Sequence, residues 1–189
     1  MIILIHGIFT EDSSKTIGTI KKHDEDAESF DYGYVSVVGA LLKNNSIAKD
    51  LAKKIKNTNG PVTIYAHSNG NAVSVIAADK YGAQIENLIC IAPALNRNLT
   101  FPPSIKNILV LSTRKDKATK SARFFDSVPI VGWLVPDIWG SMGTDNYIGT
   151  DPRITKVCMD SMIDGHSDYF SEDTLPKVMS IINEWLSSR

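Results

Sequence analysis

The sequence has no apolar run long enough to cross a membrane. A spanning helix needs about 18 to 20 consecutive apolar residues. The chain opens with the short apolar run at residues 2–5, which lacks the basic prefix and the length of a signal peptide. We therefore expect no transmembrane segment and a cytoplasmic, or already processed, protein.

The sequence also has a net charge close to zero and few cysteines. The formal charge is −1 and the isoelectric point about 6.4, so no attraction to nucleic acid or to an anionic surface is expected. Two cysteines, Cys90 and Cys158, cannot define a disulfide framework. Both lie in apolar, strand-like runs, which predicts buried thiols that pack as small hydrophobic groups. His23 stands among carboxylates in a run typical of a solvated surface, so we expect no metal and no other cofactor.

What the sequence does contain is enough apolar material for one core. Of the 189 residues, 43% are hydrophobic, which favours a single domain over residues 1–189. Buried strands are predicted at 2–6, 30–38, 62–66, 88–92, 106–111 and 154–159. Helical spacing is found at 47–56 after a capping Ser46, at 71–81 before Gly82, and at 174–186, with a further short helix expected within 13–22. This alternation predicts an α/β fold: a mainly parallel sheet of about six strands with helices on both faces.

The most informative stretch is residues 61–73, PVTIYAHSNGNAV. An unalternating apolar strand runs directly into a tight turn that contains Ser68, and a helix with small first residues follows. Such a turn strains the serine and brings neighbouring chain very close, so the flanking positions must be small. Gly70 and Ala66 satisfy that requirement.

This stretch resembles the nucleophile elbow of the α/β-hydrolase family, whose usual pattern is G-x-S-x-G. The form with alanine in the first position is similar to the elbow of the minimal bacterial lipases. The resemblance implies a small α/β-hydrolase fold with Ser68 as the nucleophile. The pair His6-Gly7 after the first strand matches a second family feature, since the loop there supplies one N–H group of the oxyanion hole.

The family pattern then assigns the oxyanion hole. The matching donor in the first loop is the amide of Ile8, with Phe9 as the alternative if the register differs by one, and the amide of Asn69 is the second. We interpret His6 itself as a strand-end histidine bonded to nearby backbone that shapes the loop. His67 is likewise interpreted as a residue needed for the shape of the turn.

A serine hydroxyl needs a histidine to take its proton and a carboxylate to orient that histidine. In this family the order along the chain is serine, acid, histidine. Asp116 follows the strand at 106–111 and matches the acid, with Asp145 and Asp151 in reserve; the alternative is that Asp116 is a helix cap or a surface carboxylate. His166 follows Gly165 and the last predicted strand, and matches the base.

Residues 124–150 are rich in aromatic residues, prolines and glycines. In hydrolases an insertion here commonly forms a cap or lid, and an apolar cap would favour acyl chains or aromatic esters. On this interpretation Phe9, Trp133 and Trp139 line the substrate pocket. Two alternatives remain open: the segment packs over the sheet edge, or it forms the interface of a homo-oligomer.

The resemblance therefore implies a cofactor-free serine hydrolase with an esterase-like or lipase-like activity on a small or lipid-like ester. A thioesterase or acyltransferase would use the same residues, and a non-catalytic ligand-binding or interaction module would have the same fold. Cleavage of amide or C–C bonds ranks below these, because nothing in the sequence selects it.

Overall fold

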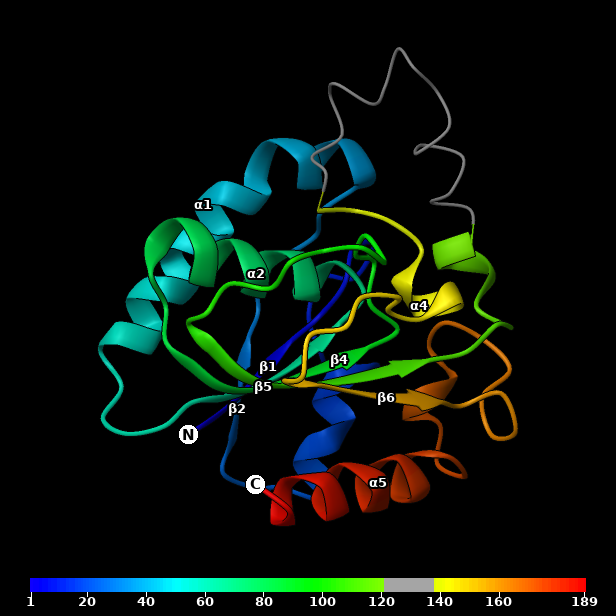
Figure 1. Ribbon diagram of the computed structural model, residues 1–189. Coiled ribbons are helices and arrows are strands. Elements are labelled where there is room, and N and C mark those ends of the chain that lie inside the picture. Colours follow the sequence, from blue (N-terminus) through cyan, green and yellow to red (C-terminus); the bar gives the residue numbers. More distant parts are fainter. Residues whose placement is uncertain (121–137) are drawn as a thin grey trace.

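The computed structural model describes residues 1–120 and 138–189, and its centre is one sheet of six strands in the order β2-β1-β3-β4-β5-β6 (Figure 1). All neighbouring strands pair in parallel. The strands are β1 Ile2–Ile5, β2 Ala27–Phe30, β3 Thr63–His67, β4 Ile85–Ile91, β5 Ile105–Ser112 and β6 Ile154–Cys158. The helices are η1 Ile17–Lys22, α1 Val37–Lys56, α2 Asn69–Tyr81, α4 Met142–Asp145, η2 Asp168–Phe170 and α5 Leu175–Ser187. The predicted α/β class with a parallel six-stranded sheet is confirmed.

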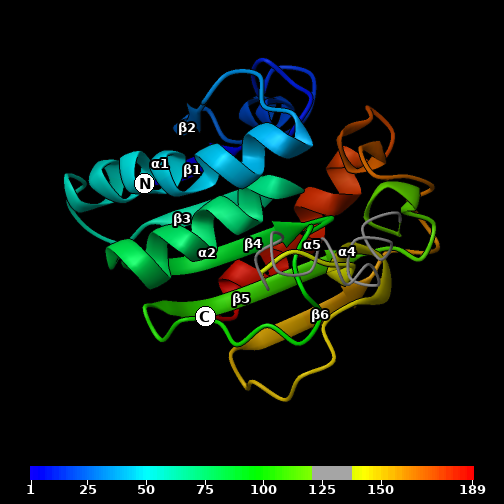
Figure 2. The same ribbon diagram turned by 90° about the horizontal axis from the view of Figure 1, so that it is seen from above.

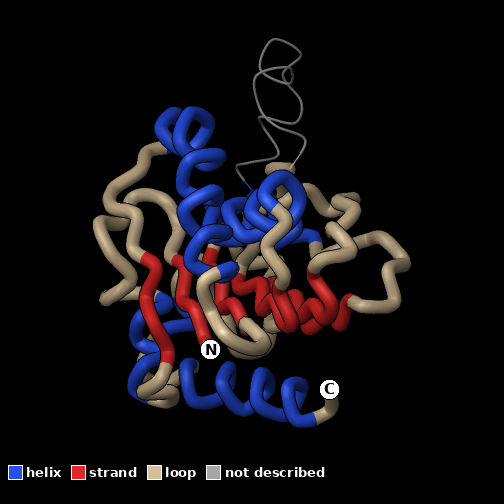
Figure 3. The backbone as a smooth tube through the Cα atoms, turned by 90° about the vertical axis from the view of Figure 1, so that its left-hand side faces the viewer, coloured by secondary structure: helices blue, strands red, loops and turns tan. Residues whose placement is uncertain are grey.

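The strands bury both faces, which explains why their sequences show no alternation of polar and apolar residues. In β1, Ile3 and Ile5 pack into the core beneath α1 and α2, while Leu4 packs into the opposite core. The second core lies under η1, η2 and α5. The ribbon shows α1 and α2 above the sheet and α5 below it, and the side view shows the same layers (Figures 1 and 3).

The parallel topology places the carboxyl ends of all strands at one edge of the sheet. The loops after β1, β3, β5 and β6 therefore approach each other there, although they are far apart in sequence. The view from above shows β3, β4, β5 and β6 side by side in that order (Figure 2). In α/β sheets, ligands bind at this edge.

Two predictions between residues 30 and 56 are wrong. The second strand is Ala27–Phe30 rather than 30–38, and the helix begins at Val37 rather than at 47. The N-cap is Ser36, whose hydroxyl accepts a hydrogen bond from Gly39 N–H at 3.1 Å, so Ser46 caps nothing. The polar residues that interrupt the helical pattern include Asn44, which is buried against α2 by a tertiary contact that the local pattern does not report.

One cysteine also departs from the prediction. Cys90 in central β4 is buried, whereas Cys158 at the end of β6 is exposed. The reason is the position of β6, which is an edge strand with a half-exposed surface. The remaining predicted strands and helices agree with the structure to within three residues at their ends, and the short helix expected within 13–22 is the 3₁₀ helix η1. No helix in the described residues is long and apolar enough to span a membrane.

Candidate active site

The turn between β3 and α2 holds Ser68 in a strained backbone conformation, with φ 53° and ψ −120°. A positive φ is costly for a residue with a side chain and persists only where the surroundings enforce it. Ser68 N–H donates to Ile91 O at 3.1 Å, which ties the turn to β4. A Cβ atom added to Gly70 would lie 2.7 Å from Ile5 O, so the close approach predicted for this position is present.

Asn71 also holds the turn, although sequence reasoning did not identify it. Its side-chain Nδ2 donates to Ala66 O and to Ser68 O, both at 3.0 Å, and the residue is completely buried. These bonds join the last part of β3 to the first turn of α2. The only local signal is an asparagine three residues after the serine, a residue type that readily bonds nearby backbone.

Asp116 and His166 meet across the two loops that follow β5 and β6. The distance from His166 Nδ1 to Asp116 Oδ2 is 2.8 Å, and the other carboxylate oxygen accepts from Thr119 N–H at 3.0 Å. Burial raises the pKa of the Asp116 carboxyl, but the hydrogen bond and charge of His166 and the bonds from Thr119 outweigh it, so the net pKa is lowered. Asp116 is therefore an ionised, buried partner that fixes the orientation of the His166 ring.

The two reserve carboxylates lie elsewhere. Asp145 accepts a hydrogen bond from Ser141 and lies 3.7 Å from Arg97. Asp151 is bound by the guanidinium of Arg153, which also donates to backbone carbonyls of the loop before β5. Of the three aspartates considered from the sequence, Asp116 is thus the one in contact with His166.

Ser68 and His166 line the same cavity, which has a volume of about 300 Å³. Its walls are mostly apolar, and Ile8, Phe9 and Trp139 are among its lining residues. Among the described residues no hydrogen bond joins the Ser68 hydroxyl to His166, and catalytic hydrogen bonds are often long until a substrate tightens the site. Trp133 and residues 124–137 of the expected cap lie outside the described residues.

Two backbone amides at the cavity are free to donate. Ile8 N–H and Asn69 N–H have no acceptor within hydrogen-bond distance in the described chain, and Asn69 is the first residue of α2, where a helix leaves its amides unpaired. Phe9 N–H donates to Val35 O at 2.9 Å and is occupied, which argues against the alternative register. The side chain of Asn69 forms a reciprocal pair with buried Asn44, at 2.8 and 3.1 Å.

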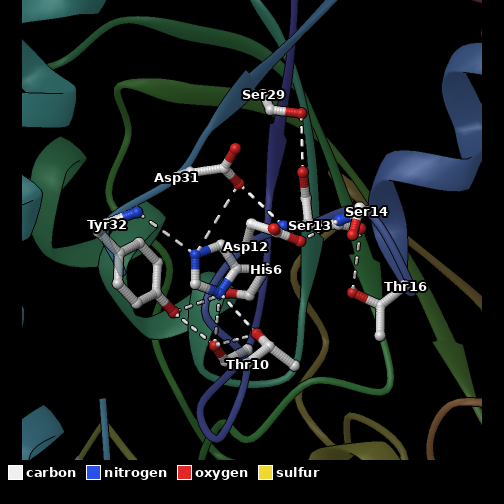
Figure 4. A network of polar contacts seen from close by, with 10 residues as sticks. His6, Thr10, Asp12, Ser13, Ser14, Thr16, Ser29, Asp31 and Tyr32 are labelled. Atoms are coloured by element: carbon white, nitrogen blue, oxygen red, sulfur yellow. Dashed lines mark hydrogen bonds and ion pairs between the residues drawn. The ribbon is translucent and has the colours of Figure 1, made fainter. Parts of the chain in front are cut away.

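His6 shapes the loop that carries Ile8 (Figure 4). Its Nδ1 lies 2.8 Å from Gly7 O and 2.9 Å from the Thr10 hydroxyl, and its Nε2 accepts from Tyr32 N–H at 3.3 Å. The Tyr32 ring stacks on the imidazole at 4.0 Å, and its hydroxyl donates to His6 O at 2.7 Å. Burial lowers the pKa of His6. Nδ1 is thus bonded to nearby backbone of the loop, as the sequence interpretation expected, and Nε2 ties the loop to the segment that follows β2.

His67 makes closer contact with the site than the sequence suggested. Its Nε2–H donates to His166 O at 3.1 Å, and its ring lies 4.7 Å from the His166 ring and 4.9 Å from the Phe170 ring. Burial, followed by repulsion from a charged His166, lowers the pKa of His67 to about 3. His67 is therefore a neutral support beneath the His166 loop.

The described residues contain no group of three His, Cys, Asp or Glu side chains that could hold a metal ion. The chemistry available at this edge of the sheet is that of a serine hydroxyl, an imidazole bonded to a buried carboxylate, and two free amides. These are the groups that acyl transfer requires.

Comparisons with known proteins identify the architecture. No protein-family model and no curated protein sequence matches the chain. A putative hydrolase of the α/β superfamily from Xanthomonas campestris is similar in structure, with TM-score 0.60 and 15% identity over 100% of this chain and 98% of that one. Mouse alpha/beta hydrolase domain-containing protein 10 gives TM-score 0.63 and 14% identity over 99% and 89%.

A lipase from Bacillus licheniformis is similar as well, with TM-score 0.55 and 16% identity over 95% of this chain and 90% of that one. Identities this low carry no information about substrate, but the coverage is nearly complete in both directions. The element order, the parallel sheet and these likenesses lead to the same conclusion: the chain has the α/β-hydrolase fold.

Proposed function

We propose that this protein is a serine hydrolase that cleaves carboxylic esters through an acyl-enzyme. The observation that carries the proposal is the 2.8 Å bond between His166 and buried Asp116, at a cavity that Ser68 also lines. A histidine oriented by a carboxylate beside a strained serine is the arrangement that activates a hydroxyl group for attack.

In the proposed reaction the Ser68 hydroxyl attacks the ester carbonyl while His166 accepts its proton. Asp116 stabilises the imidazolium that forms, and the amides of Ile8 and Asn69 donate to the developing oxyanion. His166 then returns the proton to the leaving alcohol. A water molecule, deprotonated by His166 in the same way, cleaves the acyl-enzyme and regenerates the serine.

The cavity favours an uncharged substrate. Its described lining includes two titratable residues, His67 and His166, and the first of these is held neutral by burial. The apolar remainder suits a neutral acyl group better than an anionic one, because no Lys or Arg among the described lining residues would compensate a buried negative charge. A thioester of a neutral acyl group would contact the same apolar lining, so a substrate panel must include both carboxylic esters and thioesters.

A fluorophosphonate probe with mass spectrometry of the labelled peptide tests the proposal. We expect labelling at Ser68, none in Ser68→Ala, and a loss of about three or more orders of magnitude in rate in His166→Ala, because members of such a set act as a unit. His23→Ala removes an exposed imidazole that does not line the cavity and serves as the control. A folded wild-type protein that neither labels nor hydrolyses any ester in a panel of increasing acyl length would overturn the proposal.

A further inference from the structure

The proposed acid and base lie on two different loops, which must keep a fixed position relative to each other. Asp116 follows β5 and His166 follows β6, and β6 is an edge strand that pairs with β5 alone. Backbone pairing extends slightly past the strands, since Met159 N–H donates to Ser112 O at 2.7 Å. Beyond that point the two loops need side-chain contacts to hold the 2.8 Å bond between His166 and Asp116.

Asp160, at the start of the second loop, supplies such contacts. Its Oδ1 accepts from Arg114 N–H at 2.7 Å and from the Thr113 hydroxyl at 3.2 Å, while Oδ2 pairs with the Arg114 guanidinium. Thr113 Oγ1 also lies 3.1 Å from Ile163 O, so its one hydroxyl proton is shared between Asp160 and the turn that leads towards His166. The carboxylate of one loop therefore binds the backbone of the other, two residues before Asp116.

These bonds differ in strength. The Arg114 side chain is 81% exposed, and an exposed ion pair contributes little. The Asp160 side chain is only 20% exposed, and a backbone N–H donating to a carboxylate is a charge-assisted bond of the stronger kind. The hydrogen bond from Arg114 N–H, followed by that from its side chain, lowers the pKa of Asp160 to about 2, so the carboxylate is charged at neutral pH.

We propose that Asp160 is a positioning residue for the proposed hydrolysis: by binding Thr113 and the Arg114 amide, it holds the loop of Asp116 against the loop of His166. This inference rests on the proposed function only for its kinetic consequence. A misplacement of about 1 Å in a catalytic set can cost about 100-fold in rate.

The test compares Asp160→Ala with Asp160→Asn. Asparagine keeps an oxygen for Arg114 N–H and loses the charge, whereas alanine loses every bond. We expect kcat to fall by about 10-fold to 100-fold in the alanine variant with KM nearly unchanged, and the asparagine variant to recover most of the loss. Asp164→Asn is the matched control, because it removes the exposed pair with Lys115, 2.5 Å apart, from the same loop.

A readout that does not need turnover is the proton NMR resonance of the His166 Nδ1–H group bonded to Asp116. We expect it in the wild type and in Asp160→Asn and Asp164→Asn, and expect it weakened by faster exchange in Asp160→Ala. Thr113→Val keeps the shape of the side chain and removes its hydroxyl, so we expect it to weaken the resonance less than Asp160→Ala does. If the alanine variant does not fold, the Thr113→Val result tests the inference in its place.

A folded Asp160→Ala protein with an unchanged resonance and kcat within twofold of the wild type would overturn the inference. So would an equal loss in Arg114→Gln, because that variant removes only the exposed ion pair. A wild type that shows the resonance and lacks hydrolysis would instead count against the proposed function and leave the positioning role measurable.

Discussion

Replacing His67 with phenylalanine should make the protein less sensitive to acid. His67 is buried and neutral because burial, and then the charge of His166, lower its pKa from 6.5 to about 3. The titratable groups that interact with it are His166, Asp116 and, more weakly, His6. Phenylalanine keeps a ring of similar size against Phe170 and cannot take up a proton.

The size of the effect follows from the two pKa values. In the unfolded chain His67 binds a proton near its ordinary pKa of 6.5, whereas in the folded chain it does so only near 3. Between these values the unfolded state binds more protons, so stability falls as the pH falls. At pH 4.5 the pH lies about 2 units below the pKa of His67 in the unfolded state. At about 1.4 kcal/mol for each unit, proton binding then stabilises the unfolded state by about 3 kcal/mol.

Urea denaturation at pH 7.5 and pH 4.5 measures this difference. We expect the free energy of unfolding of the wild type to drop by about 3 kcal/mol more than that of His67→Phe. The variant also loses the bond to His166 O, which lowers its stability by about 1 to 3 kcal/mol at both pH values and cancels in the comparison. The stability that is lost at low pH because Asp116, whose folded pKa is lowered, takes up a proton is common to both proteins.

Equal losses in the two proteins would refute the reasoning. His23→Gln is the control, because it removes an exposed histidine and should reproduce the wild-type loss.

The remaining predictions concern the turn and the thiols. Gly70→Ala places a Cβ atom 2.7 Å from Ile5 O and 2.8 Å from His6 O, both backbone atoms, so we expect a loss of about 1 to 3 kcal/mol in urea denaturation and slower labelling of Ser68 by a fluorophosphonate. Unchanged stability would mean that β1 can move away from the turn. Of the two free thiols, Cys158 should react with a chromogenic disulfide reagent in the native protein, whereas Cys90 should react only as fast as the chain unfolds, because it is buried and burial raises its pKa. Fast reaction of both thiols in the folded protein would contradict the packing of β4.

The sequence by itself determined the class of the fold and the places where its chemistry could lie. Unalternating apolar runs report strands buried on both faces, and the strand, turn and helix around Ser68 are local features that sequence patterns describe well. Asp116 and His166 were candidates because each follows a predicted strand and matches the order serine, acid, histidine of the family that the sequence resembles. Strands of a parallel sheet deliver their following loops to one edge. Their contact at 2.8 Å is a property of the folded chain.

Only the tertiary structure decided the features that depend on partners distant in sequence. The start of α1 at Val37 was missed because the polar stretch around Asn44 breaks the apolar pattern, while in the fold Asn44 is buried by its bonds to Asn69. The exposure of Cys158 follows from an edge position that strand order sets and composition does not. Asp160 reads locally as a surface carboxylate, and its bonds to the loop before Asp116 exist because β5 and β6 lie side by side. Local pattern indicates which segments form strands and helices, whereas the tertiary arrangement decides which residues such as Asn44 are buried, which such as Cys158 are exposed, and what each one contacts.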